Sequence, residues 1–274
     1  MDEKDVINRL TEAKIEGIDT PLRAAQIKRT LLNAAAKKAK PTMLIKLVPA
    51  ATAIAFALAV TTYFVVDNMS EGKQFNKRGG YWSTYSDKQE GGSSEVWPAP
   101  PQGFHNEFTM SQPGYGGQQF AVRVTGHTGA KLGLNYNYFG FVVRIDEKSQ
   151  CPRCQGTNIS RFSGIRFKIK GSIPTGNLLF ILPHESGECL KERLTCRSLT
   201  GYADYEKDIT SQVTNDWSTV MINFRTDMKQ PFWTPAGAVV PMDRVLENVH
   251  LFKWQYKNGD GRPVDIWVAD VELF

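Results

Sequence analysis

Four cysteines are the most reactive side chains of this 274-residue chain, and they occur as two pairs, Cys151 with Cys154 and Cys189 with Cys196. Four cysteines allow three disulfide connectivities. Their thiolates also suit a structural zinc ion, although the second pair is more widely spaced than in most zinc sites. A Cys-x-x-Cys pair can be redox-active, but that chemistry usually needs a thioredoxin-like βαβ setting, and none is visible. The residues therefore leave open two disulfides, one disulfide with two free thiols, or a zinc site.

Catalytic arrangements are scarce in the sequence. The string that starts at His184 and Glu185 begins like the helix of a zinc protease, but it has no second histidine four residues on. There is no Gly-x-Ser-x-Gly nucleophile elbow and no phosphate-binding glycine loop followed by Lys-Ser or Lys-Thr. A glycosidase would need two carboxylates across a cleft, for which Glu185 and Glu188 are the candidates. We therefore expect a protein that is not an enzyme.

Aromatic and polar side chains that suit carbohydrate binding are frequent. Sugars present apolar C–H faces, which aromatic rings cover, and hydroxyl groups, which amides, imidazoles and carboxylates bind. Trp254 and Gln255 point to opposite faces of one predicted strand, so only one of them can face a given groove. Trp217 and Trp267 are assigned to the core. The candidate ligand-binding residues are Tyr136, Tyr138, His184, Glu185, Trp233, Trp254 and Gln255.

The segments that carry these residues are short and separated by turn residues. Ile165, Phe167 and Ile169 alternate with basic residues, which predicts a half-exposed strand. Helical periodicity is almost absent after Asp67. The pattern predicts a mainly β domain, a two-sheet jelly-roll sandwich, over residues 79–274. Further predicted strands are Tyr136–Val143, Asn177–Leu182, Trp217–Phe224, Val249–Tyr256 and Val264–Phe274.

An uncharged apolar run extends from Leu47 to Val66, and we expect one transmembrane helix within residues 43–67. About 20 apolar residues of helix match a hydrocarbon core of roughly 30 Å. Lysines cluster just before the run, so the positive-inside rule places the N-terminus in the cytoplasm and the chain after Asp67 outside. A cleaved signal peptide and a buried core helix are the alternatives. The first is disfavoured because about forty residues precede the run.

Residues 1–42 are predicted to be a short helical cytoplasmic segment, and residues 68–78 a polar linker. Thr20 and Pro21 are a typical helix start, and the helix that follows carries an apolar stripe. Such a stripe is typical of a membrane-proximal helix or of a helix that docks a cytoplasmic partner. The basic residues of this segment favour contact with anionic lipid. Nucleic acid is not an expected partner, because the segment has no aromatic residue to stack on bases.

Several strings after the linker share the order and spacing of one family. They are Gly79–Asp87, Gly91–Ser94, Arg161–Phe167, Ile181–Pro183, Gly187–Cys189 with Cys196, Trp217–Val220 and Val264–Val271. Together they resemble bacterial jelly-roll carbohydrate-binding modules of family 11 and similar galactose-binding-like domains. The resemblance covers residues 79–274 and leaves the inner piece and the span unmatched. It implies a non-catalytic domain with a concave face that often binds glycans, although the same fold serves unrelated binding functions.

The resemblance has two further implications. It supports a disulfide between Cys189 and Cys196, after which Cys151 would pair with Cys154, and the predicted position outside the cell favours such bonds. Many relatives also bind a structural calcium ion through an acidic residue of the last strand, a position that Asp270 matches. The string Phe75–Arg78 lacks the acid that relatives carry near the domain start. Calcium prefers six to eight oxygen ligands, so calcium is an expectation that rests on Asp270.

These observations favour a single-pass protein of the inner membrane that displays a non-catalytic, carbohydrate-binding-module-like β domain on the extracytoplasmic side. One alternative is a transmembrane sensor or anti-sigma-like regulator, with a cytoplasmic protein bound to residues 1–42. Another is a structural subunit of a cell-surface complex. The expected partners are membrane lipid and a glycan or surface protein.

Overall fold

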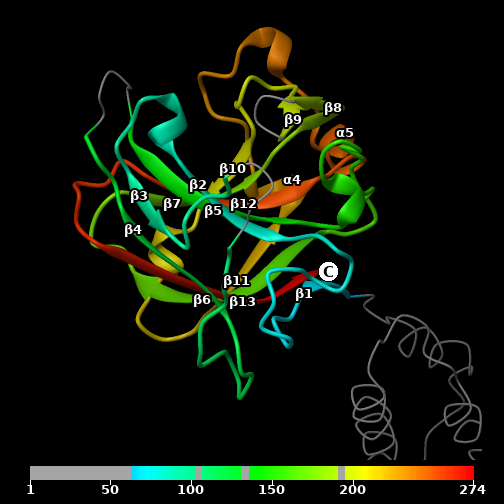
Figure 1. The fold of residues 1–274 in the computed structure, drawn as a ribbon. Coiled ribbons are helices and arrows are strands. Elements are labelled where there is room, and N and C mark those ends of the chain that lie inside the picture. Colours follow the sequence, from blue (N-terminus) through cyan, green and yellow to red (C-terminus); the bar gives the residue numbers. More distant parts are fainter. Residues whose placement is uncertain (1–62, 103–106, 131–135, 191–194) are drawn as a thin grey trace, which may run out of the picture. The chain divides into compact units, whose positions relative to one another are not determined.

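The computed structural model describes residues 63–102, 107–130, 136–190 and 195–274, which form two packed β-sheets (Figure 1). In the first sheet the strands follow the order β11-β6-β13-β4-β3, and β1 also pairs with β13. The second sheet has the order β10-β7-β12-β5-β2, and β8 with β9 forms a separate hairpin. Each described strand pair is antiparallel. The bounds in the first sheet are β1 (Phe64–Asp67), β3 (Glu95–Trp97), β4 (Val122–His127), β6 (Gly164–Ser172), β11 (Ser218–Asn223) and β13 (Val264–Leu273).

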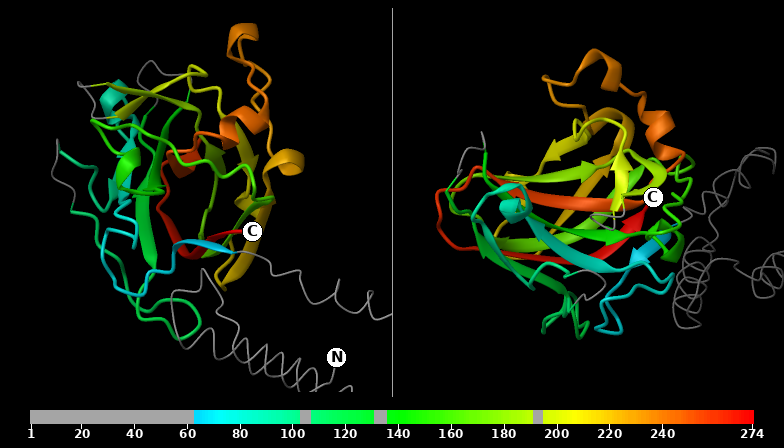
Figure 2. Two further views of the ribbon diagram at one scale, coloured as in Figure 1. Left: turned by 90° about the vertical axis from the view of Figure 1, so that its right-hand side faces the viewer. Right: turned by 45° about the horizontal axis from the view of Figure 1, so that its top comes forward.

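The second sheet and the short elements complete the described fold. Strands β4, β5, β6 and β7 alternate between the two sheets, as in a jelly roll, and Figure 2 shows the two layers from other sides. Two short helices, α4 (Phe224–Asp227) and α5 (Met242–Leu246), flank a loop that projects beyond the sheets (Figure 2). The remaining bounds are β2 (Trp82–Ser86), β5 (Tyr138–Arg144), β7 (Asn177–Leu182), β8 (Glu185–Leu190), β9 (Thr195–Ser198), β10 (Tyr205–Asp208) and β12 (Leu251–Lys257).

The core between the sheets is built around Trp254, whose side chain is 0% exposed. Its ring stacks on Phe141 at a centroid distance of 5.3 Å and meets Phe167 and Phe180 edge-on at 5.2 and 5.4 Å. Trp82 from β2 closes the cluster at 5.7 Å. Offset and edge-on aromatic pairs add to the free energy gained by burying their large apolar surface. This cluster holds the two sheets at a fixed spacing.

The predicted strands are confirmed wherever the alternation was clear. The Asn177–Leu182 prediction matches β7, and Val264–Phe274 matches β13 to within one residue. The assignment of Trp217 and Trp267 to the core was right only in part, because both are half-buried and pack against the core. Alternation along β13 turns Ile266 and Val268 inward and therefore Trp267 outward. On that outer face the Lys170 ammonium lies 5.0 Å from the Trp217 ring and 4.8 Å from the Trp267 ring.

The end of the predicted membrane helix differs from the structure. Phe64–Asp67 is not helical but forms β1, which pairs with the end of β13, and Val66 is buried in the core. The compact unit begins at Tyr63, ahead of the predicted linker. In the part of the chain that the structure describes, no helix is long and apolar enough to cross a membrane. The rest of the predicted span and residues 1–42 lie outside the described residues, so both stay predictions.

Candidate functional site

The outer face of the second sheet carries a row of tyrosines. Ring centroids are 5.6 Å apart between Tyr136 and Tyr138, and 6.1 Å apart between Tyr138 and Tyr85. The Tyr85 hydroxyl donates a hydrogen bond of 3.0 Å to Oε1 of Gln255, and the Lys253 ammonium lies 4.7 Å from the Tyr85 ring centroid. We call these five residues the tyrosine surface. It joins three strands and the segment before β5 into one aromatic and polar platform.

Strand register explains why Tyr85 reaches across the sheet. Tyr85, Gly140 and Gln255 stand opposite one another on β2, β5 and β12. Gly140 has no side chain, so the Tyr85 ring can lie over it and meet Gln255. A Cβ atom at Gly140 would overlap the Tyr85 hydroxyl and the carbonyl oxygen of Trp254. A glycine between two long polar side chains therefore shapes the centre of the tyrosine surface.

We expect Gly140→Ala to lower the free energy of unfolding by about 1–3 kcal/mol, because the added methyl group overpacks a rigid backbone contact. It should also displace the Tyr85 ring, which chemical shifts of the tyrosine ring protons would report. Gly237→Ala is the matched control, because nothing lies within 4 Å of a Cβ at that position. Equal stability of the two variants in urea unfolding would contradict the packing described here.

Charged groups flank the tyrosine surface on one side. Burial lowers the pKa of the Lys253 ammonium, while the negative charges of Asp204 and Glu185 oppose that shift. Asp204 accepts hydrogen bonds from the Thr200 hydroxyl at 2.5 Å and from the backbone N–H of His184 at 3.2 Å. Burial raises the pKa of its carboxyl group. The platform therefore ends in donors and acceptors that are held in place by the loop before β10.

The structure brings some predicted site residues together and separates others. Tyr136, Tyr138 and Gln255 share the tyrosine surface, where Tyr136 is 44% exposed and the neighbouring Tyr138 is buried. His184 lies next to Asp204, and burial lowers the pKa of its imidazole. His184 therefore lies at the edge of the platform, and its Nδ1 forms no hydrogen bond with the described residues there.

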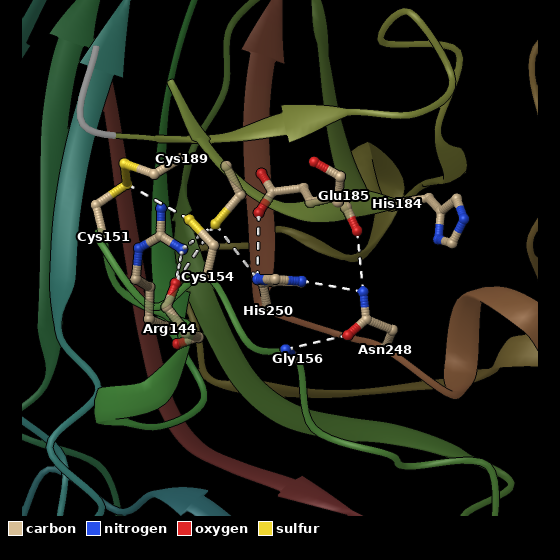
Figure 3. Close-up of polar contacts among 12 residues, drawn as sticks. Arg144, Cys151, Cys154, Gly156, His184, Glu185, Cys189, Asn248 and His250 are labelled. Atoms are coloured by element: carbon tan, nitrogen blue, oxygen red, sulfur yellow. Dashed lines mark hydrogen bonds and ion pairs between the residues drawn. A yellow bond between two sulfur atoms is a disulfide. The ribbon is translucent and has the colours of Figure 1, made fainter. Parts of the chain in front are cut away.

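Three predicted ligand residues lie elsewhere. The prediction that Trp254 binds ligand was wrong. The alternation of β12 that turns Gln255 outward turns Trp254 into the core. Glu185 points toward His250, with Oε2 3.9 Å from Nδ1, while the His184 ring points away from them (Figure 3). Trp233 is 52% exposed in the loop between α4 and α5, next to a fully exposed Phe232. No contact of Trp233 with the tyrosine surface is present in the described chain.

The cysteine pairing also differs from the prediction. Cys151 forms a disulfide with Cys189, whereas Cys154 and Cys196 are buried thiols. The pairing implied by the family resemblance, Cys189 with Cys196 and Cys151 with Cys154, was therefore wrong. The segment that contains Cys151 packs against the β8–β9 hairpin, so a partner distant in sequence is as close as the local one.

Cys196, His250 and Glu185 have the residue types of a nucleophilic site but not its properties. The Cys196 sulfur lies 3.4 Å from Nδ1 of His250, and both residues are buried. Burial raises the pKa of the Cys196 thiol, and burial with the nearby Arg144 charge lowers the pKa of His250 to about 4. Both groups are therefore neutral near pH 7 and shielded from a substrate. This cluster gives no reason to expect acyl-transfer chemistry.

The position expected to bind calcium has one carboxylate. Asp270 lies at a bulge of β13 with a positive φ of 50°, and its Oδ1 accepts a hydrogen bond of 2.7 Å from the Gln118 amide. Among the described residues, no group of three potential ligands includes Asp270. One carboxylate that already accepts an amide N–H does not form the oxygen cage that calcium prefers. Calcium binding stays a prediction.

A second concave surface lies on the outer face of the first sheet. It encloses about 650 Å³ between β3, β4 and β13. Its wall includes Trp97, which is 51% exposed, and the Arg123–Asp265 ion pair at 2.8 Å. The residue types would suit a polar ligand, but the groove is open and has one exposed aromatic ring rather than a row.

Comparisons with known proteins find likenesses of structure only. No protein-family model matches the chain, and no curated protein matches it significantly. The family 11 carbohydrate-binding module of the cellulosomal cellulase Lic26A-Cel5E of Clostridium thermocellum is 17% identical, with a TM-score of 0.45 over 77% of this chain and 94% of that one. The family 30 module of the cellulosomal cellulase Cel9D-Cel44B from the same organism is 14% identical, with a TM-score of 0.38 over 67% and 90%. At these values the likeness carries no inference about function.

Sequence reasoning missed Tyr85, Lys253 and Asp204. For Tyr85 a signal was present, because it follows Trp82 by three positions on a strand and must face away from it. The same alternation separates Lys253 from Trp254. Asp204 had no such signal, since it belongs to a loop whose path depends on its packing.

Proposed function

We propose that the β-sandwich binds glycan, without catalysis, through the tyrosine surface. The row of three tyrosine rings that ends at Gln255 and Lys253 supports this proposal. Tyrosine rings provide flat apolar area for the C–H faces of sugar rings, and their hydroxyl groups stay available for polar contacts. A rigid sheet under the rings reduces the entropy that binding costs.

Roles can be assigned to individual residues. The exposed Tyr136 would stack on a sugar ring, and the buried Tyr138 would support the Tyr136 ring by packing against it. Lys253 and Asp204 would donate and accept hydrogen bonds to hydroxyl groups at the other end of the platform. This division resembles the way in which polar groups orient a ligand while apolar groups supply contact area.

Affinity electrophoresis of the full chain in detergent, through gels that contain soluble plant and bacterial polysaccharides, tests this proposal. We expect retardation by at least one polysaccharide and a loss of about tenfold in affinity for Tyr136→Ala, because one stacking contact contributes about 1 kcal/mol or more. Trp97→Ala, on the opposite sheet, is the matched control and should bind normally. Loss of binding in Trp97→Ala alone would move the site to the groove on the first sheet.

We further propose that the sandwich is anchored by one membrane helix and lies on the extracytoplasmic side of the inner membrane, with residues 1–42 in the cytoplasm. A helix that ends before Tyr63 would have to begin near Met43 and would include Lys46, whose long side chain can reach the membrane interface. The disulfide is of the kind found in oxidising compartments. Protease added to intact spheroplasts should digest the sandwich, whereas digestion only after permeabilisation would reverse the topology.

A protein partner is the second candidate, as for a subunit of a surface complex. The loop between α4 and α5 supports it, because Phe232, Trp233 and Val239 are all exposed there. Exposed aromatic residues that cluster on one loop are typical of protein contacts. If a protein co-purifies with the full chain in detergent and is lost in Phe232→Ser, the loop is a protein-binding site.

A further inference from the structure

All four cysteines come together at one place although they derive from two distant segments. Cys189 and Cys196 stand directly opposite each other on β8 and β9, so their side chains share one face of the hairpin. The Cys151–Cys154 turn packs onto that face (Figure 3). The Cys154 sulfur is 3.5 Å from that of Cys151, and its thiol also interacts with that of Cys196. We call these four residues the sulfur cluster.

The spacing of three sulfurs in the cluster is close to that of a tetrahedral metal site. Zinc–sulfur bonds of about 2.3 Å place the sulfurs of a tetrahedron roughly 3.8 Å apart. The sulfurs of Cys151, Cys154 and Cys189 already lie within 4.8 Å of one another. Breaking the disulfide would require its two sulfurs to separate from about 2 Å to that distance. Cys196 interacts with Cys154 but does not lie within 4.8 Å of all three sulfurs, so as the fourth ligand it would have to move toward them.

Polar groups around the cluster point to a negatively charged occupant. Arg144 is buried, and its Nη1 donates to the carbonyl oxygen of Ser149 at 2.6 Å and faces the Cys196 sulfur at 4.0 Å. The charge of the nearby Glu185 carboxylate favours the charged form of this guanidinium. A buried cation needs negative charge around it. Four thiolates around one Zn²⁺ carry a net charge of −2 and would add to that of Glu185.

The hydrogen bonds of Asn248 fix the role of His250. The Asn248 Oδ1 accepts from the backbone N–H of Gly156 at 3.1 Å, and its Nδ2 donates to the carbonyl oxygen of Glu185 at 2.9 Å. The amide therefore presents N–H to Nε2 of His250, 3.2 Å away. Since Nε2 is the acceptor, Nδ1 carries the proton and faces the Cys196 sulfur at 3.4 Å and Oε2 of Glu185 at 3.9 Å. His250 supports a thiolate and does not itself offer Nδ1 to a metal.

We propose that, once its disulfide is reduced, the sulfur cluster binds one Zn²⁺ through Cys151, Cys154, Cys189 and Cys196, with Arg144 and His250 as supporting donors. A dithiol reductant transfers two electrons and two protons to the Cys151 and Cys189 sulfurs and is itself oxidised to a disulfide. Zn²⁺ then displaces four thiol protons as four Zn–S bonds form. The chain thus has an oxidised, metal-free state and a reduced, zinc-bound state at one site, independent of the tyrosine surface.

The buried group formed by Glu185, Cys196 and His250 is the rival set of ligands, because its ligand atoms also lie within 4.8 Å of one another. A metal on Nδ1 of His250 would require the proton to move to Nε2, where the Asn248 amide N–H already points. Rotating that amide would break its bonds to Gly156 and Glu185. Zinc binding by the four cysteines of the sulfur cluster needs no rotation of the Asn248 amide.

The full chain in detergent, reduced with dithiothreitol and freed of reductant without oxygen, should be titrated with zinc chloride. We expect one Zn²⁺ to be retained per chain after gel filtration, with four thiols protected from a thiol reagent and recovered after a chelator is added. Cobalt(II) in place of zinc should give the sulfur-to-metal charge-transfer absorption of a tetrahedral thiolate site. The oxidised chain should retain none.

Variants separate the two ligand sets. Cys154→Ser and Cys196→Ser should weaken zinc binding by at least 100-fold, whereas Glu185→Gln should bind zinc as the parent does. If the serine variants do not fold, zinc should still raise the melting temperature of the reduced parent chain, because a ligand stabilises the state that binds it. A reduced, folded chain that keeps four reactive thiols and no zinc would overturn the proposal. Loss of zinc in Glu185→Gln would overturn the assigned ligands.

Discussion

Trp254→Ala should lower the free energy of unfolding by about 3–5 kcal/mol, the range for removing a large aromatic side chain from a core. Trp254 is completely buried and contacts four other aromatic rings, one of them stacked within 4° of parallel. The cavity would lie between the two sheets, where neither backbone can move inward without breaking strand pairing. Urea unfolding followed by far-ultraviolet circular dichroism measures the loss.

Two further variants make the Trp254 result specific. Trp254→Phe keeps an aromatic ring and should lose clearly less stability than the alanine variant, because a smaller cavity remains. Trp233→Ala, in an exposed loop, should change stability by less than about 0.5 kcal/mol. A Trp254→Ala chain of normal stability that fails to bind polysaccharide would instead support the ligand role that the sequence suggested.

Which side chains of a strand face the core could be predicted from the sequence more reliably than which strands lie next to one another. Period-two alternation fits β6, β12 and β13, which have apolar residues at every second position, whereas β7 was predicted as a continuous apolar run that ends at Pro183. The same rule, applied to Trp267, gives the outer face, and a preference for burying tryptophan led to its assignment to the core. The direction in which a strand points a side chain decides its burial more than the hydrophobicity of that one residue does.

The tyrosine surface could be predicted only in part. Tyr136, Tyr138 and Gln255 were singled out by residue type, but nothing in the sequence indicates that β5 lies between β2 and β12. That order brings Tyr85 to Gln255 across 170 positions of the chain. Sheet order depends on how the whole core packs, so a site assembled from three strands is not readable from any one of them.

The disulfide of the sulfur cluster also depends on tertiary packing and could not be predicted from the sequence. The family resemblance implied one bond within each cysteine pair. The structure instead joins residues 38 positions apart, because the hairpin and the Cys151–Cys154 turn pack together. The disulfide therefore joins the cysteines that tertiary packing brings together, not those that are nearest in the sequence.

Removing the disulfide should cost almost as much stability as removing the core tryptophan. A bond between residues 38 positions apart restricts the unfolded chain by about 4 kcal/mol in the chain-entropy model. We expect Cys151→Ala/Cys189→Ala to lose about 2–4 kcal/mol in urea unfolding under non-reducing conditions. A chelator in the buffer excludes any contribution from zinc.

Reduction provides the internal control for this result. Dithiothreitol with chelator should lower the stability of the parent chain to about that of the double variant and should leave the double variant unchanged. Cys189 bonded to Cys196 would close a much shorter loop and would survive Cys151→Ala, so the single variant distinguishes the two pairings. Mass spectrometry of non-reduced peptides provides the direct measurement, and a peptide that links Cys189 to Cys196 would refute the bond between β8 and the Cys151–Cys154 turn.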